Sequence, residues 1–153
     1  DAQFVQGNHS QSKLGTLRGL HYQLHHPQAK LCRAIRGAVL AVVADIRVAS
    51  PRFGQWTSVE LSAENKRQIF VPRGFAHGFT VLTEEAEFLY KCDDFYTPGD
   101  EYGVAWNCPR IGVDWGLGST QSTQPILSEK DGRYLSLDSI SRDDLPLYAP
   151  ITC

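Results

Sequence analysis

Histidines are the residues of this chain best suited to acid–base chemistry, because an unperturbed imidazole changes charge near neutral pH. Three of them, His21, His25 and His26, are close enough in sequence to raise the question of a metal site. Adjacent residues on a strand point to opposite faces, however, and Pro27 places the 25–26 pair on a loop, so these side chains are not spaced as a ligand set. The sequence therefore argues against metal binding. The complete set of five is His9, His21, His25, His26 and His77.

Two of these histidines lie in apolar, strand-like segments. His21 occurs in Gly-Leu-His-Tyr, and His77 occurs in Phe-Ala-His-Gly-Phe. A histidine in such a place is either a core residue that is hydrogen-bonded to a neighbour or a catalytic group. Tyr90 poses a similar choice, because in the segment EFLYKC it points to the face opposite Lys91, where a buried tyrosine is usually a packing residue. These residues alone leave both interpretations open.

Charged residues near His21 are candidates for holding an anion. The four cations Arg18, Lys30, Arg33 and Arg36 form either a solvated face or a clamp for phosphate. Asp131, in Ser-Glu-Lys-Asp-Gly, has the surroundings of a turn aspartate. The sequence contains no P-loop, nucleophile elbow or dinucleotide-binding fingerprint. On these residues, we expect a soluble domain with a histidine-centred anion site.

The segments that carry these residues have the pattern of β-strands. Short apolar or alternating runs are separated by turn residues, and no segment before position 130 repeats apolar residues with a helical period. The polar sequence from Ser119 is expected to form a long loop, and positions 136–145 a short helix. Frequent short strands indicate an all-β sandwich or barrel with a single domain over 1–153. The expected strands are 16–23, 31–35, 38–47, 56–61, 68–71, 76–82 and 87–92.

The composition excludes several classes of protein. A formal net charge of −2 argues against a general nucleic-acid binder, which would carry a basic excess. No apolar run approaches the roughly 18 residues of a membrane helix, and no secretory leader is present, so a cytoplasmic protein is expected. The widely spaced cysteines predict free thiols and no disulfide framework or zinc ribbon. They are Cys32, Cys92, Cys108 and Cys153.

The sequence resembles the dTDP-4-dehydrorhamnose 3,5-epimerase family in the order of its motifs. The matching stretches are FVQGNHSQSKLGTLRGLHYQ (4–23), AKLCRAIRGAVLAVVADIR (29–47), SPRFGQWTSVELSAENKRQIFVPRGFAHGF (50–79), AEFLYKCDDFYTPGDE (86–101) and PILSEKD (125–131). The resemblance implies a cupin-type jelly roll, a homodimer and a reaction without a metal or organic cofactor. The substrate would be a dTDP-linked 4-keto-6-deoxy sugar that is inverted at C3 and C5.

The resemblance also assigns roles to individual residues. His21 matches the base, Asp131 the carboxylate that orients it, Tyr90 the proton donor on the opposite face, and Lys30 a cation near the sugar ketone. An unperturbed histidine, with a pKa of about 6.5, is mostly neutral at pH 7 and can therefore accept a proton. Further contacts to the sugar or nucleotide fall on Gln6, Asn8, Arg18, His77, Phe95, Glu101 and Lys130, with Phe95 stacked on the thymine.

The resemblance raises two expectations about the structure and leaves three alternative functions open. Family members carry about forty further residues before the position of Phe4, so the chain is expected to lack a segment that contacts nucleotide across the dimer. Arg18 and His21 have opposite strand parity, and both reach a ligand only if Gly19 forms a bulge. The alternatives are an epimerase that acts at C3 or C5 alone, a metal-dependent cupin oxygenase and an inactive sugar-binding jelly roll.

Overall fold

The computed structural model describes residues 3–120 and 124–149, and its regular structure is almost entirely β-strand. Every strand predicted from the sequence is present, with ends that differ by one or two residues. Cys153 and positions 121–123 of the polar segment lie outside the described residues. The strands are β1 Gln6–Lys13, β2 Leu17–Gln23, β3 Lys30–Arg36, β4 Ala38–Asp45, β5 Trp56–Ser62, β6 Ile69–Val71, β7 Phe75–Val81, β8 Glu85–Cys92 and β9 Glu101–Gly103.

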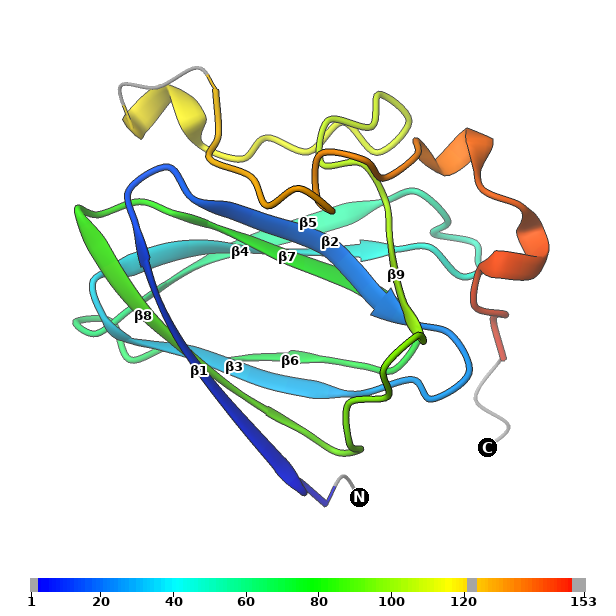
Figure 1. Ribbon diagram of the computed structural model, residues 1–153, viewed down its shortest axis with the longest axis horizontal. Coiled ribbons are helices and arrows are strands. Elements are labelled where there is room, and N and C mark those ends of the chain that lie inside the picture. Colours follow the sequence, from blue (N-terminus) through cyan, green and yellow to red (C-terminus); the bar gives the residue numbers. More distant parts are fainter. Residues whose placement is uncertain (1–2, 121–123, 150–153) are drawn as a thin grey trace.

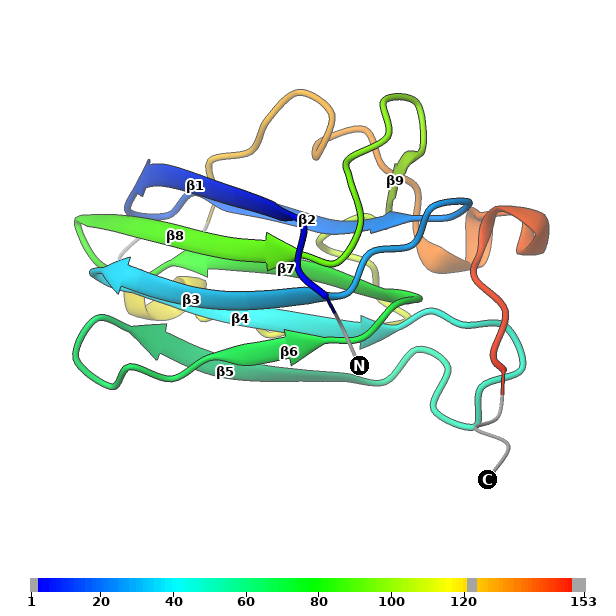
Figure 2. The same ribbon diagram turned by 90° about the horizontal axis from the view of Figure 1, so that it is seen from below.

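The strands form two antiparallel sheets that face each other (Figure 1). One sheet has the order β1-β8-β3-β6, and the other has the order β5-β4-β7-β2-β9. Figure 2 shows the first of these sheets from its outer side, with β8 between β1 and β3. Strands adjacent in a sheet are therefore mostly distant in sequence, as in a jelly roll. The all-β fold predicted from the sequence is confirmed, and the jelly-roll order is consistent with it.

The core has two parts, one on each side of the larger sheet. Between the sheets, Val39 and Ala41 of β4 pack with Phe79 of β7 and Phe88 of β8. On the outer face of the larger sheet, the chain after β9 supplies a second apolar layer, visible above that sheet in Figure 1. Strand β4 is buried on both faces, which explains its nearly continuous apolar sequence. Residues of the outer layer include Leu17, Leu20, Val42, Ile46, Trp115 and Leu145.

The predicted helix over 136–145 is not a single helix. Instead, two 3₁₀ turns, η2 Leu137–Ser139 and η3 Arg142–Asp144, are separated by extended backbone at Ile140 and Ser141. The Ser141 hydroxyl accepts a hydrogen bond from the Asp143 N–H, so this side chain starts a new turn and the earlier one is not continued. A third 3₁₀ turn, η1, covers Leu117–Thr120.

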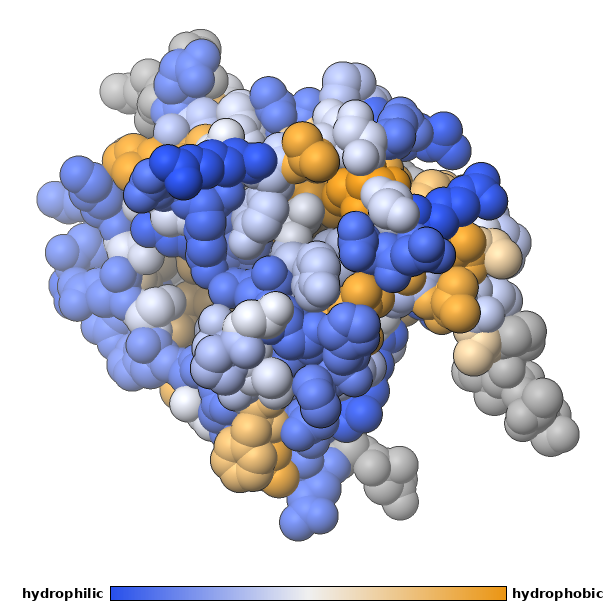
Figure 3. All heavy atoms as spheres, turned by 45° about the vertical axis from the view of Figure 1, so that its right-hand side comes forward, coloured by the Kyte–Doolittle hydropathy of each residue, from blue (hydrophilic) through white to orange (hydrophobic). Residues whose placement is uncertain are grey.

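The thiols and the surface agree with a folded β-domain. Cys32, Cys92 and Cys108 are free and buried, as predicted. In the face shown in Figure 3 the surface is largely hydrophilic, with apolar side chains in separate patches. Among the described residues, no helix has the length and apolar character needed to cross a membrane.

Candidate active site

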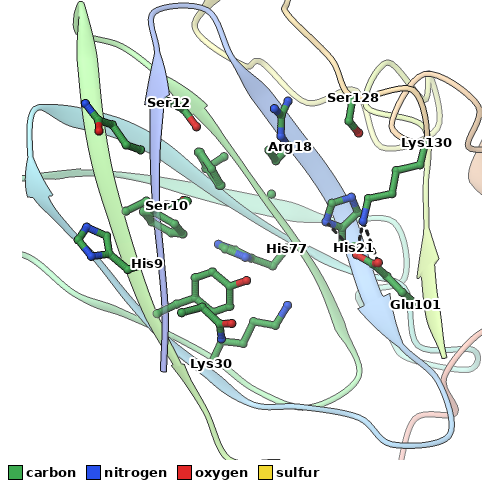
Figure 4. Close-up of a pocket in the computed structure, with 16 residues that line it drawn as sticks. His9, Ser10, Ser12, Arg18, His21, Lys30, His77, Glu101, Ser128 and Lys130 are labelled. Carbon is green, nitrogen blue, oxygen red and sulfur yellow. Dashed lines mark hydrogen bonds and ion pairs between the residues drawn. The ribbon is translucent and has the colours of Figure 1, made fainter. Parts of the chain in front are cut away.

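A cavity of about 500 Å³ opens between the two sheets, and most of the predicted site residues line it. Strands β1, β3 and β8 form one wall, and β2, β7 and β9 form the other. Figure 4 shows His21 and His77 on the second wall and Lys30 on the first. The predicted residues that line this cavity are Asn8, Arg18, His21, Lys30, His77, Tyr90, Glu101 and Lys130.

Behind His21, at the wall of the cavity, lies a buried carboxylate. Asp131 Oδ1 is 2.5 Å from His21 Nε2, and the Asp131 side chain is wholly buried. Its second oxygen accepts a hydrogen bond of 2.5 Å from the Ser128 hydroxyl. Burial alone would raise the pKa of Asp131, but the hydrogen bonds from His21 and Ser128 outweigh burial and lower it. Asp131 is therefore an anion at neutral pH and holds one nitrogen of the His21 ring.

An irregularity in β2 brings Arg18 and His21 to the same cavity. The register between β2 and β7 shifts between these two residues. At the shift, Gly19 has a φ of +113°. A Cβ at Gly19 would lie 2.6 Å from the Gly78 Cα, so only glycine fits this approach of the two backbones. Of the two alternatives for this segment, the structure shows the irregularity that brings Arg18 and His21 to one cavity.

The short strand β9 places a second carboxylate beside His21. Glu101 Oε1 is 3.8 Å from His21 Nδ1, and the Lys130 ammonium donates to both Glu101 oxygens at 2.7 and 2.8 Å. Burial would raise the pKa of Glu101, but the Lys130 hydrogen bond and the nearby His21 lower it. His21 thus has an acidic side chain close to each of its ring nitrogens.

On the opposite wall, Lys30 and Tyr90 lie together. The Lys30 ammonium is 5.7 Å from the centre of the Tyr90 ring, and Lys30 forms no salt bridge within the part of the chain that the structure describes. Burial is the main reason that the pKa of Tyr90 is raised to about 12, so its hydroxyl keeps its proton at neutral pH. This wall therefore offers a neutral proton donor and a cation that can attract negative charge on a ligand.

His77 stays neutral between these two walls. Burial, helped by the nearby Lys30 and His21, lowers the pKa of His77 to about 3. Its ring stacks on Phe88 with centroids 6.1 Å apart, and its Nε2 is buried without a hydrogen-bond partner among the described residues. An unpaired buried nitrogen costs stability, so this atom is a candidate contact for a ligand.

A smaller space of about 110 Å³ adjoins the main cavity and contains Gln6, Tyr96 and Cys92. The structure does not bring Phe95 there: its side chain is 64% exposed and lines neither space. The neighbouring Tyr96 lines the smaller space, and its backbone N–H donates to Gln6 Oε1 at 2.8 Å. Of these two adjacent aromatic residues, Tyr96 is the one that lines the smaller space, and the stacking of Phe95 on a base stays a prediction.

Comparison with known proteins gives this cavity a context. A family model described as dTDP-4-dehydrorhamnose 3,5-epimerase matches residues 1–139. The chain belongs to this family. A dTDP-4-dehydrorhamnose 3,5-epimerase from Pseudomonas aeruginosa is 56% identical over 128 residues, which cover 84% of this chain and 68% of that protein.

Solved structures of similar proteins include more than one specificity. The epimerase RmlC from Legionella pneumophila, solved with dTDP-4-keto-L-rhamnose, has a TM-score of 0.92 and 47% identity, covering 97% of this chain and 77% of that one. ChmJ, a 3′-monoepimerase from Streptomyces bikiniensis solved with dTDP-quinovose, has a TM-score of 0.87 and 35% identity, covering 95% and 72%. This member of the epimerase family is therefore similar both to a 3,5-epimerase and to a monoepimerase.

Sequence reasoning missed several residues of the site. Ser10 and Ser12 of β1 line the cavity, but their polar strand gave no apolar pattern. Ser128 holds Asp131, and the only sequence signal was its position three residues earlier in a turn. Tyr134 contacts His21, with ring centroids 5.7 Å apart, and nothing in its local sequence indicated this.

The structure shows how the side chains that could bind a metal are arranged. Over residues 3–120 and 124–149, no three side chains of His, Cys, Asp or Glu gather in a way that could hold a metal ion. His25 and His26 lie on a loop, where their backbone N–H groups donate to Asp100. This position agrees with the prediction that Pro27 places His25 and His26 on a loop.

Proposed function

We propose that this chain inverts C3 and C5 of dTDP-4-dehydro-6-deoxy-D-glucose to give dTDP-4-dehydro-L-rhamnose. The observation that carries the proposal is the His21–Asp131 pair, which faces Tyr90 and Lys30 across one cavity. Carbons next to a ketone lose a proton only when the resulting enolate is stabilised, and inversion requires the proton to return from the other face. A base and an acid on opposite walls meet that requirement.

In the proposed mechanism, His21 Nδ1 removes the proton, because Asp131 engages Nε2. The C–H electron pair forms the C=C bond of an enolate, and the ketone oxygen takes the negative charge. Asp131 stabilises the imidazolium that forms, as the carboxylate does in a hydrolase triad. Lys30 forms no salt bridge within the described residues and stabilises the enolate oxygen.

Tyr90 then donates its proton to the opposite face of the carbon, and the same steps at the second carbon complete the reaction. The hydroxyl is protonated at neutral pH, as a donor must be, although its raised pKa of about 12 makes it a weaker acid than a free tyrosine. Each well-placed acid or base of this kind contributes about 10²–10⁴-fold. Water returns the proton to Tyr90 and removes the proton from His21.

The remaining residues are proposed to bind the nucleotide sugar. Arg18 and Lys130 offer cations for the diphosphate, while His77 Nε2 offers an unpaired nitrogen to the sugar. Gln6, Asn8 and Glu101 provide polar groups, and Tyr96 provides an aromatic face for the base in place of Phe95. We further propose a cytoplasmic homodimer that uses no metal or organic cofactor.

A second candidate is an epimerase that inverts one carbon only. The similarity to ChmJ, which is a 3′-monoepimerase, favours this alternative. The base, the carboxylate and the tyrosine serve both reactions equally well. The difference lies in how many of the two carbons lose a proton.

Incubation with dTDP-4-dehydro-6-deoxy-D-glucose in D₂O, followed by NMR, tests the proposal. Deuterium at both C3 and C5 is expected, and deuterium at one carbon alone would establish the second candidate. His21→Asn is the matched variant, since it keeps a polar side chain of similar size but removes the base. Normal deuterium uptake by this variant, with an unchanged melting temperature, would overturn the role of His21.

A further inference from the structure

Tyr134 packs against His21 in addition to the contact that Asp131 makes. Its ring centroid is 5.7 Å from that of the imidazole, and the two ring planes meet at 71°. Tyr134 is half-buried and is absent from the residues that line the cavity, so it contacts the imidazole and not a ligand there. The segment after η1 therefore supplies His21 with two neighbours, the Asp131 carboxylate and the Tyr134 ring.

A glycine on β9 makes room for this ring. Gly103 is the residue of β9 paired with His21. A Cβ at position 103 would lie 2.5 Å from Tyr134 Cζ and 2.6 Å from Cδ2, closer than real Cβ contacts. Gly103 does not have the positive φ that would itself demand glycine, so its backbone conformation is open to alanine. The structural demand for glycine at this position comes from the tyrosine ring.

A single hydrogen bond does not fix the orientation of an imidazole ring. The bond from His21 Nε2 to Asp131 sets the position of one nitrogen, but it leaves the ring free to tilt about that contact. A packed aromatic neighbour restricts the ring plane, and a shift of 1 Å in a catalytic group can cost about 10²-fold in rate. The edge-on contact with Tyr134 supplies such a restriction on the side of the strand where Gly103 leaves space.

We propose that Tyr134 is a positioning residue, seated on Gly103, that holds the His21 ring so that its free nitrogen faces the sugar carbon. This inference rests on the proposed function, in which His21 is the base. It is the aromatic ring that acts, and the hydroxyl has no part in the contact. Burial and the nearby Glu101 and Asp131 carboxylates raise the pKa of Tyr134, so the hydroxyl stays neutral and adds no charge beside the base.

Steady-state kinetics with dTDP-4-dehydro-6-deoxy-D-glucose, and calorimetric titration with dTDP, test the inference on four variants. Tyr134→Ala removes the ring, and Tyr134→Phe keeps it. Gly103→Ala leaves the tyrosine in place but pushes its ring away, and the double variant combines Gly103→Ala with Tyr134→Ala.

We expect Tyr134→Ala and Gly103→Ala to lower kcat by about tenfold or more, with KM and the Kd for dTDP changed by less than about threefold. Tyr134→Phe should restore most of the lost kcat. In the Tyr134→Ala background, Gly103→Ala should cost less than about twofold more, because the ring it displaces is already gone.

Several results would overturn the inference. Equal loss in Tyr134→Phe and Tyr134→Ala would assign the effect to the hydroxyl. Fully additive losses in the double variant would mean that Gly103 acts independently of Tyr134. If Tyr134→Ala does not fold, Gly103→Ala with an unchanged melting temperature and unchanged kcat would refute the proposal by itself. Absence of turnover by the unaltered chain would instead refute the proposed function.

Discussion

Acidification should destabilise this fold through His77. In the folded chain, burial and the nearby Lys30 and His21 lower the pKa of His77 to about 3, whereas an unfolded histidine has a pKa of about 6.5. Between these values the unfolded chain binds a proton at this site and the folded chain does not. The contribution of His77 to stability is therefore complete above about pH 6.5 and is lost progressively as the pH falls towards 3.

The size of the effect follows from the two pKa values. At pH 4.5 the protonated form of His77 outnumbers the neutral form about a hundredfold in the unfolded chain. In the folded chain His77 remains almost entirely neutral. Two pH units correspond to about 2.7 kcal/mol of unfolding free energy. Since single domains are stable by only about 5–15 kcal/mol, this loss is large enough to measure.

Urea denaturation at pH 7.0 and pH 4.5 measures the effect, with His77→Gln as the matched variant that does not titrate. The fall in unfolding free energy between the two pH values should be smaller in the variant by about 2.7 kcal/mol. Carboxylates whose pKa is lowered by folding, Asp45, Asp100, Glu101 and Asp131, also lose stabilisation in acid, but both proteins share them and their contribution cancels. An equal fall in the two proteins would refute the reasoning, because His77 would then be solvated or partnered in the folded state.

Two further predictions concern the chemistry. Tyr90→Phe should reduce inversion far more than C–H exchange in D₂O, because His21 can still remove and return a proton on one face; an equal loss of both would assign Tyr90 to binding or enolate stabilisation. Asp131→Asn should lower kcat/KM by at least about 10²-fold and move the acidic limb of its pH profile to lower pH, because the variant lacks the anion that stabilises the imidazolium. If the acidic limb of the kcat/KM profile does not move in Asp131→Asn, the limb reflects the titration of a group other than His21.

The strands with an apolar face could be predicted from the sequence, and the strands without one could not. Strand β4 is buried on both sides, so its sequence does not alternate between apolar and polar residues. Its β-branched residues and the turns on either side still identify it as a strand. Strand β1 reads Gln-Gly-Asn-His-Ser-Gln-Ser-Lys and has no apolar face. Five consecutive polar residues of this strand, positions 8–12, line the cavity, so no apolar pattern marks it in the sequence. Only pairing with β8 makes it a strand.

The site was predictable to the extent that the family motif identifies residues. His21, Tyr90 and Lys30 were assigned by resemblance, and the structure brings them to one cavity. Contacts between segments far apart in the chain gave no local signal, and the packing of Tyr134 on Gly103 is an example. Phe95 shows the other limit, because choosing between adjacent aromatic residues requires knowing which side of the chain faces the site.

The charged groups in the cavity explain why a proton taken up by His21 does not pass to His77. His21 is paired with His77 across β2 and β7, and the two side chains line the same cavity. His21 has the Asp131 and Glu101 carboxylates beside its two nitrogens, whereas His77 is buried and feels the positive charge of Lys30. When His21 takes a proton from the sugar, its positive charge contributes to the low pKa of His77. The proton therefore stays on His21 until it leaves to solvent or returns to carbon, and His77 remains a neutral hydrogen-bonding group throughout.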